Sequence, residues 1–239
     1  MIYPRIIAHR CGGALTPENT LAGLRLAARL GCRGVEFDAM LAADGVPVLI
    51  HDETLERTTS GRGRVAEMAS VRLSGLDAGS RHHAAFAGEP LPTLDVALQL
   101  CAALGLWANV EIKPSAGQEA ETGRVVARHA AAATGRLLLS SFSAEALCAA
   151  ASEAPQLPRA LLVEEIPADW RERVAETAAL ALHSAARKLT VEGAQAVRAA
   201  GFPLACYTVN RRDEAERLFA MGVSAVFSDR PDLWAAEEM

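Results

Sequence analysis

Two histidines in the first quarter of the chain have the residue type and setting for acid–base chemistry. His9 and His51 each stand beside another polar residue, Arg10 and Asp52 respectively. An imidazole titrates near neutral pH, so two of them can remove a proton at one point of a reaction and donate one at another. A single histidine is more often a structural residue, but two in this setting indicate a candidate catalytic pair.

Two carboxylates, Glu36 and Asp38, stand two positions apart and would face the same side of an extended strand. They would repel each other unless a cation lay between them. Glu111, which follows a later apolar run, could supply a third oxygen ligand. An all-carboxylate set favours a hard divalent cation, Mg²⁺ or Ca²⁺. A structural ion-pair cluster with Arg10 and Lys113 fits the same spacing equally well; in a catalytic site these two cations would hold phosphoryl oxygens.

These candidates lie at the ends of apolar runs that alternate with Ala- and Leu-rich helical stretches. We predict strands at residues 6–8, 35–38, 107–112, 137–139, 159–163, 180–182, 204–209 and 225–227, with a further short strand at 46–50. We predict helices at 18–30, 94–104, 119–133, 144–153, 169–177, 191–200 and 213–221. Thr16 or Asn19, and Thr93, are candidate N-caps. The eight strand–helix units indicate an α/β TIM (β/α)8 barrel, with an open doubly wound sheet as the alternative.

Residues 1–239 are predicted to form a single barrel domain with one inserted segment after the second strand. Residues 52–92 are polar, rich in glycine and long for a connection, so we interpret them as an insertion or lid. The carboxyl ends of barrel strands meet at one rim, where catalytic groups are placed. Besides the residues above, Ser140, Ser141, His183, Asn210 and Asp229 lie at predicted strand ends, whereas His82, His83 and His129 are expected at the surface.

Composition narrows the classes of function. The net charge of −5 without a basic run argues against nucleic-acid binding. No run of about 20 apolar residues indicates membrane insertion, and residues 1–10 are too short and polar for a signal peptide. Five widely spaced cysteines argue against a disulfide framework or a structural zinc site. We therefore expect a cytoplasmic enzyme acting on a small molecule, of undetermined oligomeric state.

Eleven short motifs, taken together and in order, resemble the glycerophosphodiester phosphodiesterase family, and its bacterial cytoplasmic members most closely. They extend over nearly the whole chain, which makes the set specific although each piece is weak. The motifs are HRCG (9–12), PENT (17–20), EFD (36–38), DG (44–45), HD (51–52), LERT (55–58), LPTL (91–94), EIKP (111–114), SSF (140–142), YTVN (207–210) and SDRP (228–231).

The resemblance implies a TIM barrel that hydrolyses glycerophosphodiesters, such as glycerophosphocholine or glycerophosphoethanolamine, to glycerol 3-phosphate and an alcohol. It also implies that the insertion recognises the glycerol end of the substrate. The site residues that it implies are the catalytic pair His9 and His51, the phosphate-binding Arg10 and Lys113, and the metal ligands Glu36, Asp38 and Glu111, with Mg²⁺ or Ca²⁺ as cofactor.

The chain departs from the family at Cys11, where glycine is usual, and at Tyr207, where tryptophan is common. A cysteine adopts positive φ only at a cost, so Cys11 bears on the geometry of its turn. Tyr207 bears on how the substrate fits.

Three other functions fit parts of the pattern. The first is a phospholipase D-like lyase that releases a cyclic phosphate, and the polar insertion counts against its acyl-chain substrate. The second is a non-catalytic barrel that binds a phosphorylated ligand, and the presence of every acid–base and metal residue counts against it. The third is an unrelated barrel isomerase or aldolase, for which the Ser228–Arg230 stretch offers only a weak phosphate-binding loop.

Overall fold

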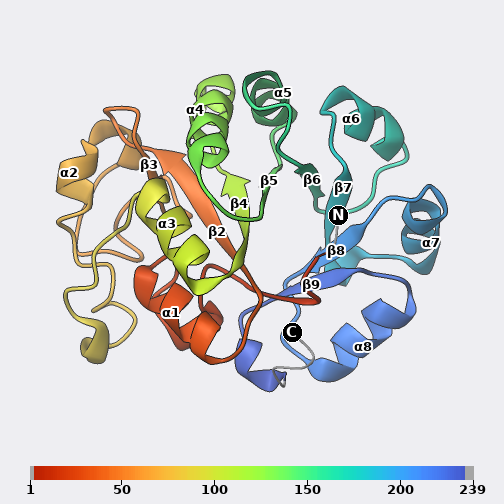
Figure 1. The fold of residues 1–239 in the computed structure, drawn as a ribbon, viewed down its shortest axis with the longest axis horizontal. Coiled ribbons are helices and arrows are strands. Elements are labelled where there is room, and N and C mark those ends of the chain that lie inside the picture. The colour runs from red at the N-terminus through yellow and green to blue at the C-terminus, as the bar shows by residue number, and fades with distance from the viewer. Residues whose placement is uncertain (1–2, 235–239) are drawn as a thin grey trace.

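Eight parallel strands close into a ring in the computed structural model, which describes residues 3–234 (Figure 1). Each strand pairs with its neighbours in the ring, and β1 pairs with both β9 and β2, which closes the barrel. This closure excludes the open sheet and confirms the predicted TIM barrel. The strands are β1 (Ile6–Ala8), β2 (Gly34–Leu41), β4 (Trp107–Ile112), β5 (Leu137–Ser141), β6 (Arg159–Val163), β7 (Ala181–Ala185), β8 (Leu204–Tyr207) and β9 (Ala225–Ser228).

A ninth strand, β3 (Pro47–Leu49), is antiparallel to β2, with Ala39 opposite Leu49. The backbone N–H of Ile50 donates to the carbonyl of Asp38 at 3.2 Å, which continues this pairing. The chain that follows β3 therefore returns to the carboxyl end of β2, and the insertion begins there, as predicted.

Helices surround the barrel, as Figure 1 shows. Within residues 3–234, seven helices of 7 to 14 residues lie outside the strands, and α2 belongs to the insertion. Within the described residues, β9 is followed by a short 3-10 turn, η5 (Pro231–Leu233). The helices are α1 (Leu21–Arg29), α2 (Ser70–Leu73), α3 (Leu94–Leu104), α4 (Glu119–Ala132), α5 (Ala144–Glu153), α6 (Trp170–Glu176), α7 (Val191–Ala199) and α8 (Arg212–Ala220). None of the helices in residues 3–234 is long and apolar enough to cross a lipid bilayer.

The two faces of β2 explain how the fold positions polar groups. Side chains alternate along a strand, so Val35 and Phe37 pack outward against the helices while Glu36 and Asp38 face the barrel interior. Burying Phe37 alone stabilises the fold by about 1.5–3 kcal/mol. A separate apolar cluster inside the barrel includes Tyr3 and Trp107. The apolar packing on both sides holds the polar residues of β2 in place.

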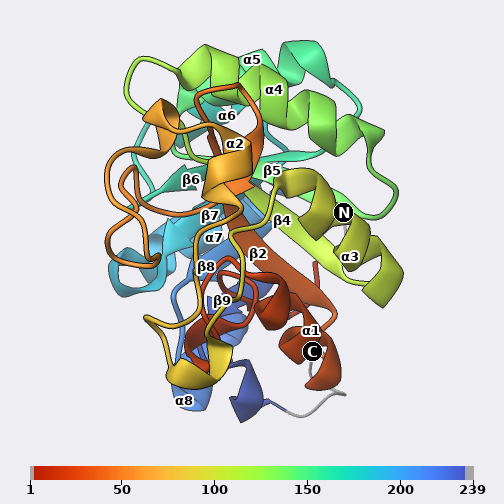
Figure 2. The same ribbon diagram turned by 90° about the vertical axis from the view of Figure 1, so that its left-hand side faces the viewer.

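The insertion is an ordered part of the structure and faces the viewer in Figure 2. It contains α2 and the 3-10 turns η2 (Val65–Glu67) and η3 (Ala84–Phe86). Leu55, Val65 and Leu73 pack with Met40 and Val48 in a small core of their own. This core attaches the insertion to the β2–β3 pair, beside the carboxyl ends of the strands.

Some predicted boundaries were wrong. The first helix begins at Leu21 and is capped by Thr20, whose hydroxyl accepts from the backbone of Gly23, rather than by Thr16 or Asn19. Asn19 cannot act as the cap because its side chain bonds to Asp38. Thr93 occupies the N-cap position of α3 without a side-chain cap bond. The strand predicted at 180–182 is β7, which extends to Ala185. Residues 1–2 and 235–239 of the predicted domain lie outside the described residues.

Candidate active site

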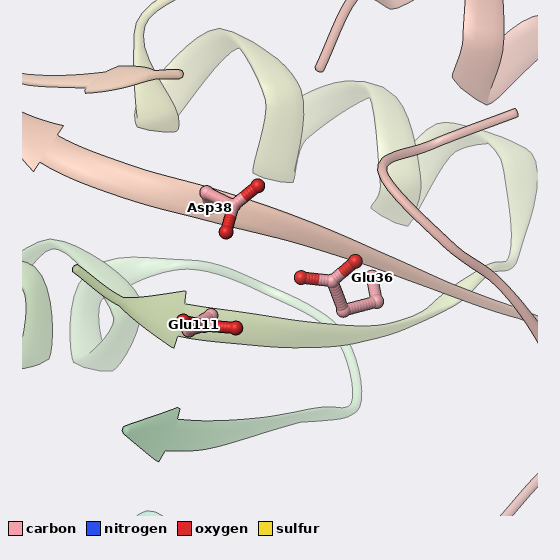
Figure 3. Close-up of side chains that lie close together, drawn as sticks. All are labelled: Glu36, Asp38 and Glu111. Atoms are coloured by element: carbon pink, nitrogen blue, oxygen red, sulfur yellow. The ribbon is translucent and has the colours of Figure 1, made fainter. Parts of the chain in front are cut away.

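Three carboxylates converge between the neighbouring strands β2 and β4 (Figure 3). Asp38 lies opposite Glu111 in the strand register, and Glu36 lies two positions earlier in β2, opposite Asn109. One oxygen from each residue falls within 4.8 Å of the others. Glu36 and Asp38 are buried, so the charges of this cluster are removed from water.

The electrostatics of this cluster fit a divalent cation. Burial, with the charge of Asp38 nearby, raises the pKa of Glu36 to about 8 and that of Glu111 to about 7. The Oε1 atom of Glu36 is buried without a hydrogen-bond partner among the described residues. A buried, unpaired carboxylate oxygen facing two further carboxylates is a donor set for a hard cation such as Mg²⁺ or Ca²⁺.

The ion-pair interpretation accounts for part of the cluster. Lys113 Nζ lies 3.2 Å from Glu111 and 3.4 Å from Asp38, and Arg10 Nε lies 3.8 Å from Asp38. Burial works against the charge of Asp38, but Lys113, His51 and Arg10 outweigh it and lower its pKa. Neither Arg10 nor Lys113 bonds to Oε1 of Glu36, so the ion pairs leave that oxygen available to a metal ion.

Each candidate catalytic histidine bonds to an aspartate through Nδ1. His9 Nδ1 lies 2.7 Å from Asp229 Oδ1, and His51 Nδ1 lies 2.7 Å from Asp52 Oδ1. Such a bond fixes the ring and leaves Nε2 for the reacting groups. The Nε2 atom of His9 lies 3.8 Å from Glu36. The structure therefore contains two histidine–aspartate dyads beside the carboxylate cluster.

The two dyads differ electrostatically. Burial lowers the pKa of His9, but the bond to Asp229 and the charge of Glu36 outweigh burial and raise it above its ordinary value. At His51, burial is the largest effect and the pKa is lowered. The second oxygen of Asp229 accepts from Asn210 Nδ2 at 3.0 Å, so Asp229 and Asn210, predicted at strand ends, support His9.

Arg57 links the His51–Asp52 dyad to Arg10 through Glu18. Its motif was noted in the sequence, but this role was not predicted. Arg57 donates to Asp52 at 2.5 and 3.1 Å and to both oxygens of Glu18 at 2.7 and 2.8 Å. Glu18 in turn accepts from Arg10 Nη1 at 3.0 Å. Asn19, which donates to Asp38 at 2.8 Å, is a second site residue that was missed. The PENT and LERT motifs carried both, but spacing alone does not reveal these contacts.

One cavity of about 330 Å³ brings the predicted site residues together. Phe142 and Tyr207 also line it, with Phe142 edge-on to Tyr207 at 6.0 Å between ring centres. The hydroxyl of Tyr207 donates to the carbonyl of Val163 at 2.8 Å, which fixes the ring. The predicted residues lining this cavity are His9, Arg10, Glu36, Asp38, His51, Glu111 and Lys113.

Cys11 has a positive φ of 78° and is fully buried. A Cβ added at Gly23 would lie 2.8 Å from the Cβ of Cys11, which is too close. The absence of a side chain at Gly23 therefore makes room for the turn at Cys11. The backbone N–H of Cys11 donates to the carbonyl of Glu36 at 2.7 Å. Burial raises the pKa of the thiol well above its ordinary value, which makes it a poor nucleophile.

The remaining histidines occupy different settings, and His183 is the one of them that lines the cavity of about 330 Å³. Because β7 extends beyond its predicted end, His183 lies within the strand, fully buried, with Nε2 3.0 Å from the hydroxyl of Tyr3. Burial lowers its pKa to about 3, so it is neutral. His82 and His83 are exposed, as predicted. His129 bonds to Asp95 between two outer helices, at 2.7 Å.

The chain matches known proteins over nearly its whole length. The model of the glycerophosphoryl diester phosphodiesterase family matches residues 9–233. A glycerophosphodiester phosphodiesterase of Caldanaerobacter subterraneus is 32% identical over 232 residues, which cover 95% of this chain and 94% of the relative.

Solved structures give the same result. A phosphodiesterase of Oleispira antarctica, in complex with the product sn-glycerol-3-phosphate, is 36% identical with a TM-score of 0.93, covering 96% of this chain and 94% of that one. A glycerophosphodiester phosphodiesterase of Agrobacterium tumefaciens is 30% identical with a TM-score of 0.77, covering 98% of this chain and all of that one.

Proposed function

We propose a reaction and its catalytic residues from one premise: the chain belongs to the glycerophosphoryl diester phosphodiesterase family. It is a glycerophosphodiester phosphodiesterase. The proposed reaction is hydrolysis of a glycerophosphodiester, such as glycerophosphoethanolamine or glycerophosphocholine, to glycerol 3-phosphate and an alcohol. The glycerol 3-phosphate in the Oleispira relative supports this choice of product.

A divalent cation, Mg²⁺ or Ca²⁺, held by Glu36, Asp38 and Glu111, would polarise the phosphoryl group and offset the negative charge that develops on it. The unpaired oxygen of Glu36 and the raised pKa values of two of the three carboxyl groups support this assignment. Lys113 stays beside the carboxylates and limits the negative charge of the site.

Arg10 and Lys113 would bind the phosphoryl oxygens from the rim of the cavity. Arg10 Nε is buried and has no hydrogen-bond partner among the described residues, so it has a donor available. The guanidinium carries a planar set of donors that matches phosphate oxygens. Lys113 follows β4 and contributes a compact positive charge from the neighbouring strand.

His9 and His51 would carry the protons. One imidazole accepts a proton from the attacking water while the oxygen of that water bonds to phosphorus. The other donates a proton to the alcohol oxygen as its bond to phosphorus breaks. Asp229 and Asp52 hold the two rings through Nδ1, so Nε2 is the atom that exchanges protons in both.

The observation that carries this proposal is the placement of two histidines and three carboxylates in one cavity, with each histidine bonded to an aspartate. We expect His9→Ala and His51→Ala to reduce release of glycerol 3-phosphate by 10²–10⁴-fold, the usual contribution of acid–base catalysis. Circular dichroism would check that both variants fold. Wild-type turnover by either folded variant would contradict the assignment.

The lyase alternative makes a different product from the same site. In that reaction a substrate hydroxyl attacks phosphorus and a cyclic phosphate is released. Phosphorus NMR of the products separates the two, because hydrolysis leaves a phosphate monoester and the lyase leaves a cyclic diester. We expect the monoester as the final product.

We also propose that the enzyme acts in the cytoplasm. The support is its five cysteines, none of which is paired in the structure. Free thiols are typical of reducing compartments. Activity assayed in separated cell fractions would test this location.

A further inference from the structure

A second cavity, of about 490 Å³, adjoins the cavity of about 330 Å³ that contains the three carboxylates, called here the carboxylate cavity. The two cavities share His9, Arg10 and Thr208 and are otherwise lined by different residues. They therefore meet at the residues proposed to contact the phosphoryl group. The second cavity is lined by His9, Arg10, Gly13, Ala14, Thr16, Glu18, His82, Thr208 and Asp229.

We propose that the second cavity binds the alcohol arm of the substrate and that His82 of the insertion helps to select it. This inference rests on the proposed function. A phosphodiester carries two arms on one phosphorus, and the structure offers two cavities that meet at the phosphate-binding residues. The glycerol arm belongs in the first cavity, because its hydroxyl groups match the carboxylates and the cation that they would hold.

The insertion supports this division. Among the described residues, 52–92 contribute nothing to the lining of the carboxylate cavity, although the family resemblance led us to expect that they recognise glycerol. They contribute His82 to the second cavity. The His82 ring lies edge-on to Phe86 at 5.6 Å between ring centres, which limits its movement. The insertion is therefore placed to contact the leaving alcohol rather than the glycerol end.

The lining of the second cavity favours an alcohol that carries N–H or O–H donors. Glu18 and Asp229 bring carboxylate oxygens to it, and these oxygens only accept hydrogen bonds. Each is already bonded to neighbours but keeps spare lone pairs. Its lining contains no Phe, Tyr or Trp in the described residues, so the aromatic faces that bind a trimethylammonium group are missing. Ethanolamine or a polyol fits this chemistry better than choline.

The test compares three substrates that share the glycerol arm: glycerophosphoethanolamine, glycerophosphoglycerol and glycerophosphocholine. We expect wild-type kcat/KM to be about tenfold higher for the first two, the effect of one or two added hydrogen bonds. We expect His82→Ala to reduce that preference about fivefold while leaving the choline substrate unchanged. His83→Ala is the matched control, because His83 is the exposed neighbour in the insertion and lines neither cavity.

Inhibition by sn-glycerol 3-phosphate distinguishes the two arms. The product carries only the glycerol arm, so its inhibition constant should be the same for wild type and His82→Ala. If His82→Ala raised the inhibition constant but left the head-group preference unchanged, the glycerol arm would lie in the second cavity, and the inference would be overturned. Unchanged values of both would show that His82 contacts neither arm and would also overturn it. If the wild type released no glycerol 3-phosphate from any substrate, the proposed function would fail, and the inference with it.

Discussion

His9 and Asp229 join the two ends of the barrel at its active rim. His9 directly follows β1 and Asp229 directly follows β9, and their side chains meet at 2.7 Å although 220 positions separate them in the chain. The pairing of β1 with β9 makes this contact possible. Closure of the barrel therefore assembles one of the two dyads.

Asp229→Asn should reduce kcat by roughly tenfold to hundredfold with little change in KM, because the amide holds the His9 ring without stabilising its positive charge. Steady-state kinetics on glycerophosphocholine, whose choline arm has no N–H or O–H to donate to Asp229, would measure both constants. Asp232→Asn is the control, since Asp232 pairs with Arg230 nearby and lines neither cavity. An equal effect of the two substitutions would remove the dyad from the account.

Arg57→Ala should reduce kcat about tenfold, because Arg57 positions two carboxylates that position site residues. Arg57 bonds to Asp52, which bonds to His51. It also bonds to Glu18, which bonds to Arg10. Its bond to Asp52, opposed by partial burial, keeps the pKa of that carboxyl below its usual range. Arg57→Lys should restore part of the activity and Arg57→Ala should change the pH profile of kcat.

The control for Arg57 is Arg64→Ala. Both arginine side chains are 46% exposed and both lie in the insertion, but Arg64 pairs with Glu53, outside the network of His51. Exposed pairs of this kind contribute about 0–1 kcal/mol, so both variants should keep nearly the same melting temperature. If both substitutions lowered kcat alike, Arg57 would be an anchor of the insertion rather than a positioning residue.

The metal-free protein should lose thermal stability as the pH rises from 6 to 8. The folded-state pKa values of Glu36 and Glu111 are raised above their ordinary values, to about 8 and about 7. Groups raised in this way favour folding at low pH, and that stability is lost as the pH rises through the folded-state values. Melting curves with EDTA would measure the loss.

Added Mg²⁺ or Ca²⁺ should remove this loss, because a cation bound by the ionised carboxylates stabilises the folded state. Glu36→Gln should reduce both the pH dependence and the stabilisation by metal. A melting temperature that neither falls with pH nor responds to metal would contradict the assignment of the three carboxylates.

Cys11→Ala should keep turnover within about threefold of wild type, because a buried thiol with a raised pKa supplies no nucleophile. The unfolding free energy should fall by about 1 kcal/mol through the lost sulfur contacts. Urea denaturation and the standard assay would measure these two effects. A loss of turnover above a hundredfold in a folded variant would show that Cys11 takes part in the reaction.

The fold was predictable from sequence because most strands contain a short apolar run that is followed by a polar residue, whereas β2 and β7 carry polar residues within the strand. β4 and α3 were predicted to the residue, since turn residues bound them on both sides. β7 was placed too early because His183 was taken as the residue that follows the strand. A histidine that bonds to Tyr3 inside a barrel looks the same in sequence as a histidine at the rim.

The seven predicted site residues line one cavity because the barrel brings together positions within its strands and positions just beyond them. Glu36, Asp38 and Glu111 lie within strands, whereas His9, Arg10, His51 and Lys113 stand one or two positions beyond a strand. Arg57 and Asn19 were missed because their roles depend on contacts with residues that other loops bring close. The division into two cavities was equally hidden, since His82 reaches its cavity only through the path of the insertion. Local pattern reveals the residue types at the rim, and tertiary structure decides which of them meet.

Release of glycerol 3-phosphate from glycerophosphoethanolamine, measured with EDTA and then with added Mg²⁺ or Ca²⁺, tests the central claim most directly. We predict that release stops with EDTA and returns with one of these metals in the wild type but not in Glu36→Gln. Release that continues undiminished in EDTA, or that Glu36→Gln carries out at the wild-type rate, would contradict a reaction built on this carboxylate site.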